Sequence, residues 1–256
     1  QFGFRAKHST THALINITEK IRNALDNNKV ACGVFVDLQK AFDTVNHEIL
    51  LNKLNHYGFR GVINDWFKSY LTDRKQRVCI NGFESNIKPI HHGVPQGSVL
   101  GPILFLLYIN DLNKCIMYSE TFHFADDTNL LNISDSYKTL QNNLNRDLIA
   151  LHEWLLANKI SLNKDKTELI YFHKVRSIIP NELKIKMNGK RLYHTNTIKY
   201  LGVNIDETLS GNEHCEELCK KLSRANGILA KARHYVPRNH LKNIYYATFS
   251  SNLYYG

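Results

Sequence analysis

Three aspartates stand where extended apolar segments end, and carboxylates in such positions could do chemistry. Asp37 closes the apolar run at 33–38, and Asp126 with Asp127 forms an acidic pair at a turn between two apolar stretches. An unpaired carboxylate at the end of a buried strand is costly to desolvate, so it needs a partner. Oxygen ligands of this kind suit hard cations such as Mg²⁺. If the three carboxylates converge, they could hold two such ions roughly 4 Å apart for an in-line phosphoryl transfer.

Each of these features also has a structural explanation. Acidic residues are common in turns, and an isolated Asp-Asp pair is more often a turn than a metal site. Phe42 lies five residues after Asp37, where its ring could exclude a 2′-hydroxyl, although helix packing explains a lone phenylalanine better. The loop at 93–98 has two glycines and a proline before a helix. It could admit a phosphate to that helix N-terminus, or it could be a tight turn with a capping serine.

The elements that must position these residues follow from apolar periodicity. The run at 33–38 predicts a buried strand, and apolar steps of three and four between Phe42 and Tyr57 predict a helix with Gly58 after its end. Further predictions are a helix over 62–71, a hairpin at Asn81-Gly82, a helix from Ser98 to about Leu112, two strands within 121–131, a helix over 140–155, a strand over 167–172, a hairpin at Asn188-Gly189 and a short strand over 200–203.

After Asp206 the pattern becomes purely helical, through Lys231 and again over 238–254. We therefore predict a boundary near 206 to 212, with these helices apolar on one side and basic on the other. Their basic residues could follow a nucleic-acid backbone, or they could be a solvated face. His214, Cys215 and Cys219 are close enough on this helix to share zinc, but a second ligand pair is missing and packed cysteines are commoner.

Composition limits the class of protein. The chain has 256 residues, 43% apolar and 22% charged, which is typical of a globular protein, and its net charge of +10 favours polyanionic partners. We predict no membrane partner, because no apolar run approaches the roughly 20 residues needed to cross a bilayer. Five scattered cysteines and no secretory signal favour reduced thiols inside a cell. Because the sequence begins with Gln1, we expect a fragment.

An ordered set of motifs resembles the reverse transcriptase domain of non-LTR retrotransposons, particularly the jockey-like group of arthropods and other animals. The motifs occur in the family's order, with similar spacing, and extend over nearly the whole chain. They are Gln1 to Arg5 with His8 to Thr10, Phe35 to Asp43, Gly93 to Ser98 with Leu100 to Pro102, Phe124 to Asp127, Asn163 to Thr167 and Tyr200 to Gly202.

The resemblance implies a role for each carboxylate. Asp37, Asp126 and Asp127 would form the metal-binding triad of a polymerase palm, with the backbone of Leu38 also near a metal. Magnesium is the expected cofactor, as two ions. Phe42 would be the steric gate that selects deoxynucleotides over ribonucleotides.

The other motifs would bind substrates. Gln96 and Gly97 would line the nucleotide and template pocket. Lys166 would approach the leaving pyrophosphate as a general acid or charge stabiliser, with Lys164 as a weaker candidate. The hairpin gripping the primer end would contain Tyr200, Leu201 and Gly202.

The fold implied is α+β, a right-hand polymerase whose antiparallel palm sheet is backed by helices. Residues 1–206 would be partial fingers and palm, and 207–256 the beginning of a truncated helical thumb. The activity implied is RNA-directed DNA polymerisation onto a primer 3′-hydroxyl, with an RNA template, a DNA primer and deoxynucleoside triphosphates as partners. A nuclear location is implied in the same way, and the oligomeric state stays open.

Part of the family pattern is missing. The finger motifs that hold the incoming triphosphate precede the point where this chain starts, and most of the thumb would follow its end. Two alternatives therefore remain. One is a catalytically silent retroelement relic that only binds nucleic acid, and the other is a group II intron-like maturase.

Overall fold

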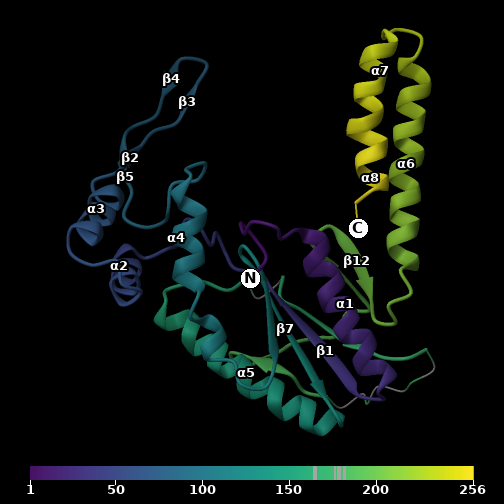
Figure 1. The fold of residues 1–256 in the computed structure, drawn as a ribbon, viewed down its shortest axis with the longest axis horizontal. Helices are drawn as coiled ribbons and strands as arrows, with labels where there is room; N and C mark the ends of the chain where they lie inside the picture. The colour runs from purple at the N-terminus through teal and green to yellow at the C-terminus, as the bar shows by residue number, and fades with distance from the viewer. Residues whose placement is uncertain (164–165, 176, 178–179, 181–182, 256) are drawn as a thin grey trace.

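A computed structural model describes residues 1–163, 166–175, 177, 180 and 183–255 of the chain. Its centre is a four-stranded antiparallel sheet with helices on both faces (Figure 1). The helices are α1 (Thr10–Asp26), α2 (His47–His56), α3 (Val62–Leu71), α4 (Leu100–Ile109), the 3₁₀-helix η1 (Leu112–Lys114), α5 (Tyr137–Ala157), α6 (Asn212–Ala232), α7 (Arg238–Tyr245), the π-helix η2 (Tyr246–Ser250) and α8 (Ser251–Leu253). The strands are β1 (Val30–Val36), β2 (Lys75–Gln76), β3 (Cys79–Ile80), β4 (Phe83–Glu84), β5 (Lys88–Pro89), β6 (Glu120–Phe124), β7 (Asp127–Ser134), β8 (Glu168–Phe172), β9 (Lys186–Met187), β10 (Lys190–Arg191), β11 (Thr197–Tyr200) and β12 (Val203–Asp206).

The central sheet has the strand order β6-β7-β1-β8. In its register Val36 lies opposite Thr128, and Gly33 lies between Leu131 and Ile170. Because β1 is an inner strand covered on both faces, it is a continuous apolar run rather than an alternating one. The predicted strand is confirmed, but it begins at Val30 and ends at Val36, so Asp37 follows the strand directly.

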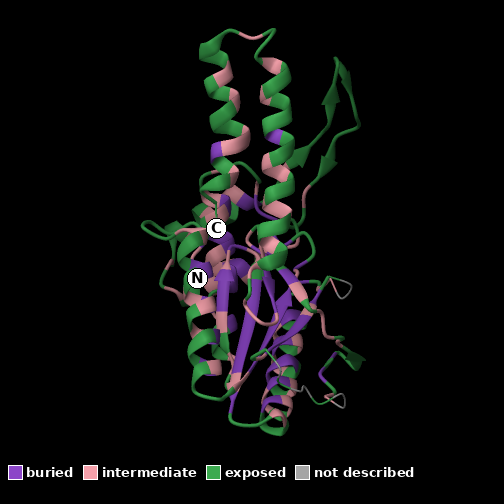
Figure 2. Cartoon of the chain, turned by 90° about the vertical axis from the view of Figure 1, so that its right-hand side faces the viewer, coloured by how far each residue is buried: buried purple, intermediate pink, exposed green. Residues whose placement is uncertain are grey.

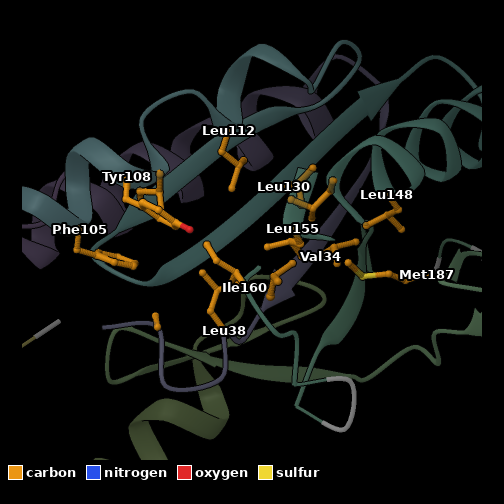
Figure 3. Close-up of a cluster of buried hydrophobic side chains, with 14 of the residues drawn as sticks. Val34, Leu38, Phe105, Tyr108, Leu112, Leu130, Leu148, Leu155, Ile160 and Met187 are labelled. Atoms are coloured by element: carbon orange, nitrogen blue, oxygen red, sulfur yellow. The ribbon is translucent and has the colours of Figure 1, made fainter. Parts of the chain in front are cut away.

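Two apolar clusters cover the two faces of this sheet, and Figure 2 shows the sheet as the most buried part of the chain. On one face, Ile17 and Ile21 of α1 belong to the same cluster as Phe35. On the other face, the leucines of α5 pack with Val34 and with Phe105 of α4, as Figure 3 shows. Since alternate residues of a strand point to opposite faces, β1 contributes to both clusters.

The segment between β1 and α4 extends away from the sheet (Figure 1). It contains α2, α3 and an arm built from the strand pairs β2–β5 and β3–β4. At the tip of the arm Asn81 and Gly82 both have positive φ, at 50° and 84°, as a tight hairpin turn requires. The predicted helix over 62–71 and the predicted hairpin are both confirmed.

After β12 the described chain is helical, and α6 runs antiparallel to α7 and α8 in a pair that projects from the sheet (Figure 1). Asp206 ends β12 and accepts hydrogen bonds from the backbone N–H groups of Thr208, Ser210 and Gly211, at 2.7–3.0 Å. These bonds form the joint before α6. The domain boundary predicted near this joint stays a prediction.

Three predicted elements differ from the structure. The helix expected to begin at Phe42 begins at His47, because Val45 and Phe42 pair through their carbonyls with the N–H groups of Gly93 and Val94. The strand predicted over 200–203 is interrupted by a turn: Tyr200 ends β11, Leu201 and Gly202 form the turn, and Val203 begins β12. The helix predicted to reach Leu112 ends at Ile109 and is followed by η1.

Helix α1 was not predicted at all, although its sequence carries the signals. Ser9 caps it by accepting a hydrogen bond from the N–H of His12 at 3.2 Å. Its buried residues recur at helical spacing: Ala13, Leu14, Ile17, Ile21 and Ala24. No helix in the described part of the chain is both long and apolar enough to cross a membrane.

Candidate active site

Asp37 and Asp127 lie at the same end of the sheet. Because Val36 pairs with Thr128, the residue after β1 and the first residue of β7 are neighbours across the two strands. Both line one pocket of about 310 Å³. The charged and polar residues that share this pocket with them are Asn129, Lys166, Glu168, Lys199 and Tyr200.

Asp126 lies in the turn beside this pocket. Residues Ala125 and Asp126 connect β6 to β7, with Phe124 paired to Asp127. Ala125 has φ of 56°, a left-handed conformation that is uncommon for a residue with a side chain. The turn therefore holds the acidic pair in a tight connection, but Asp126 does not line the pocket that contains Asp37.

The three carboxylates influence one another electrostatically. Burial first, and then the negative charges of Asp126 and Asp37, together raise the pKa of Asp127 to about 6. Asp127 as a whole residue is exposed, and it lines the pocket together with Asp37. Like charges gathered in this way gain stability from a cation placed among them.

Asn163 holds the carboxylate of Asp37 in place. Its side-chain Nδ2 donates to Asp37 Oδ2 at 2.9 Å, and its backbone N–H donates to the Asp37 carbonyl at 2.9 Å. Leu38 is buried and forms an isolated bridge with Leu162. Asn163 belongs to a motif noted in the sequence, but its contact with Asp37 was missed because no local pattern joins residues so far apart.

The donor chemistry of the acidic residues fits a hard divalent cation, because three carboxylates lie close enough to raise a neighbour's pKa. Within the residues that the structure describes, no group of three or more His, Cys, Asp or Glu side chains is gathered tightly enough to hold a metal ion. The three aspartates thus share one end of the sheet without forming a closed ligand set.

The same finding bears on His214, Cys215 and Cys219. Both cysteines are exposed free thiols on α6. The residues form no metal-binding group within the described ranges. Zinc, which the sequence already disfavoured, is not proposed.

Phe42 lies between two other rings. It packs against Phe105 with ring centroids 4.4 Å apart, and Phe4 approaches it edge-on at 6.4 Å. Phe42 is half-buried, so part of its ring faces outward. The ring is held by packing against Phe105 and Phe4, and Phe42 is not among the residues that line the pocket of Asp37.

Gln96 and Gly97 lie in the loop before α4. Gln96 Nε2 donates to Asp43 Oδ1 at 2.9 Å, and Gly97 has φ of 80°. Gln96 and Asp43 line a second pocket, of about 630 Å³, whose basic residues are Lys40, Arg74, Lys75 and His92. The contact with Asp43 was not predicted. The loop is also anchored by His47, whose Nε2 lies 2.7 Å from the carbonyl oxygen of Gly93.

Two of the remaining predicted residues, Lys166 and Tyr200, line the first pocket. Lys166 is exposed and lines it, whereas Lys164 lies outside the described residues. Tyr200 is buried, and its ring packs edge-on against Phe35 with centroids 5.4 Å apart. Leu201 and Gly202 form the turn after it, and Tyr255 donates from its hydroxyl to the Leu201 carbonyl at 2.6 Å. This turn therefore contacts the C-terminal segment.

Comparison with known proteins identifies the relatives of this chain. The family described as reverse transcriptase (RNA-dependent DNA polymerase) matches residues 1–205. The chain is 32% identical to the RNA-directed DNA polymerase from mobile element jockey of Drosophila melanogaster, over all of this chain and 29% of that protein. It is 31% identical to the probable RNA-directed DNA polymerase from transposon BS of the same species, over 86% of this chain and 25% of that protein. The chain thus spans less than a third of the length of these relatives.

Solved structures show the same fold at low sequence identity. Telomerase from Candida tropicalis, in complex with a fragment of telomeric RNA, aligns with a TM-score of 0.53 and 16% identity over 78% of this chain and 32% of that one. The apo form of the same telomerase gives a TM-score of 0.52 and 17% identity, over 78% of this chain and 36% of that one. The predicted α+β palm with its antiparallel sheet is confirmed.

Proposed function

Because this chain belongs to the reverse transcriptase family, with the jockey-like non-LTR retrotransposon polymerases among its relatives, we propose that it performs the polymerase reaction of such an element. The reaction is RNA-templated addition of deoxynucleotides to the 3′-hydroxyl of a DNA primer. The observation that carries the proposal is the meeting of Asp37 and Asp127 in one pocket, where burial and the neighbouring acids raise the pKa of Asp127. A cation-binding carboxylate pair is what phosphoryl transfer needs.

Reverse transcriptases use divalent metal ions, and we assign two Mg²⁺ ions to Asp37, Asp126, Asp127 and the backbone of Leu38. When bound, the ions would activate the attacking hydroxyl and stabilise the charge on the leaving pyrophosphate. Asn163 fixes the orientation of the Asp37 carboxylate by its hydrogen bond to Oδ2. Lys166, on the rim of the same pocket, would stabilise the pyrophosphate or protonate it.

The other assignments follow the geometry around the two pockets. Gln96 and Gly97 would contact the nucleotide and the template, since Gln96 lines the basic pocket beside Asp43. The turn after Tyr200, at Leu201 and Gly202, would hold the primer end. We further propose that 207–256 begin a thumb, and that the element acts in the nucleus, where a genomic DNA primer would be available.

Primer extension on an RNA template with Mg²⁺ tests the proposal. The comparison uses the 256-residue chain, a longer protein extended at both ends, and each of them with Asp126→Asn. We expect the substitution to lower extension at least about 100-fold, because it removes charge that the metal site needs. Asp135→Asn is the control, since this exposed acid at the far end of β7 gives the same change in net charge.

The outcomes separate the alternatives. Activity in the longer protein alone would mean that this chain lacks parts needed for catalysis. Equal activity of the parent and Asp126→Asn would contradict the site assignment. No extension by either parent, with nucleic-acid binding retained, would favour the silent relic.

Phe42→Val tests the sugar gate. Replacing the ring with a smaller side chain opens space beside the sugar, so ribonucleotide incorporation relative to deoxynucleotide incorporation should rise roughly 10-fold or more. Phe59→Val is a matched control, because the ring of Phe59, between α2 and α3, packs edge-on against Phe67 of α3. An unchanged ratio in an active Phe42→Val enzyme would remove the assignment.

A further inference from the structure

Residues 1–4 reach the turn that carries the acidic pair. The Oε1 atom of Gln1 accepts a hydrogen bond from the backbone N–H of Ala125 at 3.1 Å and another from the N–H of Gly3 at 2.8 Å. The N–H of Phe2 donates to the carbonyl of His123 at 2.8 Å. Figure 1 places the N-terminus beside this end of the sheet. Residues 1–4 thus bind the backbone immediately before Asp126.

Gly3 allows this contact because it has no side chain. A Cβ atom added there would lie 2.4 Å from the backbone nitrogen of Ala125 and 3.1 Å from its Cα. The neighbour is backbone, which cannot rotate away as a long side chain can. Any other residue at position 3 would therefore push the turn, or residues 1–4, out of place.

Phe4 reaches the other part of the site. Its ring stands edge-on to Phe42, with an interplanar angle of 88°. Phe4 has φ of 57°, a strained conformation for a phenylalanine, and its side chain is 60% exposed. Because the Phe4 side chain is mostly exposed, burial of apolar surface contributes little to holding its ring in this position. Its ring makes an edge-to-face contact with Phe42, and Phe42 also packs against the buried ring of Phe105.

We propose that residues 1–4 position the two parts of the active site relative to each other. Gln1 and Gly3 fix the turn that carries Asp126 and Asp127, and Phe4 fixes the ring that faces the sugar. Phe4 is thereby a determinant of nucleotide specificity although it lies outside the pocket that holds the carboxylates. The specificity part rests on the proposed polymerase function, whereas the positioning of the turn does not.

Backbone hydrogen exchange of the 256-residue chain tests the positioning of the turn. In Gln1→Ala the N–H of Ala125 loses its acceptor, and in Gly3→Ala the turn is displaced. We expect exchange over 124–127 to become at least about 10-fold faster in both variants, corresponding to about 1.4 kcal/mol of lost local protection. Protection of β1 should stay unchanged, which shows that the sheet is still folded.

Gly227→Ala is the control for the glycine substitution, because nothing lies within 4 Å of a Cβ added at this position on α6. Unchanged exchange over 124–127 in Gln1→Ala and in a folded Gly3→Ala would overturn the proposal. If Gly3→Ala does not fold, Gln1→Ala alone decides, since it creates no clash.

The ratio of ribonucleotide to deoxynucleotide incorporation tests the role of Phe4. Phe4→Ala should raise this ratio several-fold while Phe42 itself is intact, and Phe4→Tyr should restore it, because a tyrosine ring makes the same edge-on contact. Phe83→Ala is the control, since Phe83 is 82% exposed at the tip of the arm. An unchanged ratio in an active Phe4→Ala enzyme would overturn the specificity role.

The two measurements test the two parts of the proposal independently. If the parent protein showed no polymerase activity under any condition, the proposed function would fall together with the specificity role. The hydrogen-exchange result would still decide whether Gln1 and Gly3 position the turn.

Discussion

At the scale of single residues, ionisation of Asp127 beside Asp126 and Asp37 lowers the stability of the fold. Burial and the charges of Asp126 and Asp37 raise the pKa of Asp127 to about 6, above the ordinary aspartate value of 3.8. The folded chain then binds a proton more tightly than the unfolded chain does. Stability is therefore highest below about pH 4 as far as this group is concerned, and its contribution is lost as the pH rises through about 6.

Asp127→Asn should raise the melting temperature at pH 7 to 8 and change it little at about pH 3, below the pKa of the acid in both the folded and the unfolded chain. Thermal unfolding followed by circular dichroism at several pH values checks this. Asp26→Asn, an exposed acid at the end of α1, controls for net charge. A stabilisation independent of pH would contradict the assignment.

Addition of Mg²⁺ should raise the melting temperature of the parent chain above that of Asp127→Asn. A cation that binds only the folded state stabilises it in proportion to the logarithm of its concentration. The parent chain should gain melting temperature with Mg²⁺ at pH 7.5, whereas Asp127→Asn should gain less. Equal gains in the two proteins would mean that Asp127 is not a ligand.

At the scale of elements, Lys53 joins three helices. It lies on α2, donates to the Tyr108 carbonyl and to Asp111 Oδ1 at 2.6 Å each, and stands over the rings of Tyr108 and Trp154. Burial lowers the pKa of Lys53, against the hydrogen bond and charge of Asp111, which raise it. The contacts connect α2 with the α4–η1 region and with α5. They therefore hold α2, in the segment between β1 and α4, against the helices that cover the sheet.

Lys53→Met should lower the free energy of unfolding by roughly 2–3 kcal/mol, because it leaves the half-buried Asp111 without its partner. Urea unfolding measures the change. Lys221→Met breaks an exposed pair with Glu217 on α6 and should lower the free energy of unfolding far less, because solvent screens the pair. Similar losses in the two variants would show that Lys53 does not fix α2.

Local patterns predicted the elements whose signals are local. The Asn81-Gly82 turn, helix α3 and the capped helix α5 follow from turn chemistry and spacing. The segment at 42–46 has helical spacing, but its pairing with Gly93 and Val94, far along the chain, keeps it out of the helix. The tight turn at Leu201-Gly202 was missed because leucine rarely takes positive φ.

The candidate site shows the same division. The three aspartates could be singled out as acids at strand ends, and the sheet register brings Asp37 and Asp127 together. The residues that hydrogen-bond to the site residues could not be predicted from the sequence. Asn163 for Asp37, Asp43 for Gln96 and Gln1 for Ala125 are contacts that only the assembled fold defines.

At the scale of the whole molecule, the net charge of +10 is the main term for binding a polyanion. The projecting pair of α6 and α7 exposes Arg224, Lys231, Arg238 and Lys242, and Arg233 is exposed just after α6. The pair has little buried contact of its own, with Ala225 its one fully buried residue on α6. The basic surface of this helix pair is thus available to solvent or to a negatively charged partner.

Changing Arg233, Arg238 and Lys242 together to Gln should weaken binding to a primer–template and flatten its salt dependence. The slope of log K against log salt should fall by about 0.7–0.9 for each lost phosphate contact. Fluorescence anisotropy at several salt concentrations measures this. The same change at Arg22, Lys29 and Lys138, near the other end of the sheet, should lower affinity less. Equal effects would mean that net charge alone, and not this helix pair, binds the partner.

The inner strand β1 contributes to both apolar clusters and leads directly into Asp37. At Gly33 an added Cβ would lie 2.8 Å from the Phe35 ring and 3.3 Å from the Phe172 ring. A substitution on this strand would therefore disturb packing on either face and displace the carboxylate beyond its end. When copies of a gene accumulate random mutations, a single substitution in β1 would therefore disrupt both the packing of the sheet and the position of Asp37. A substitution in the projecting helices would leave the three aspartates in place.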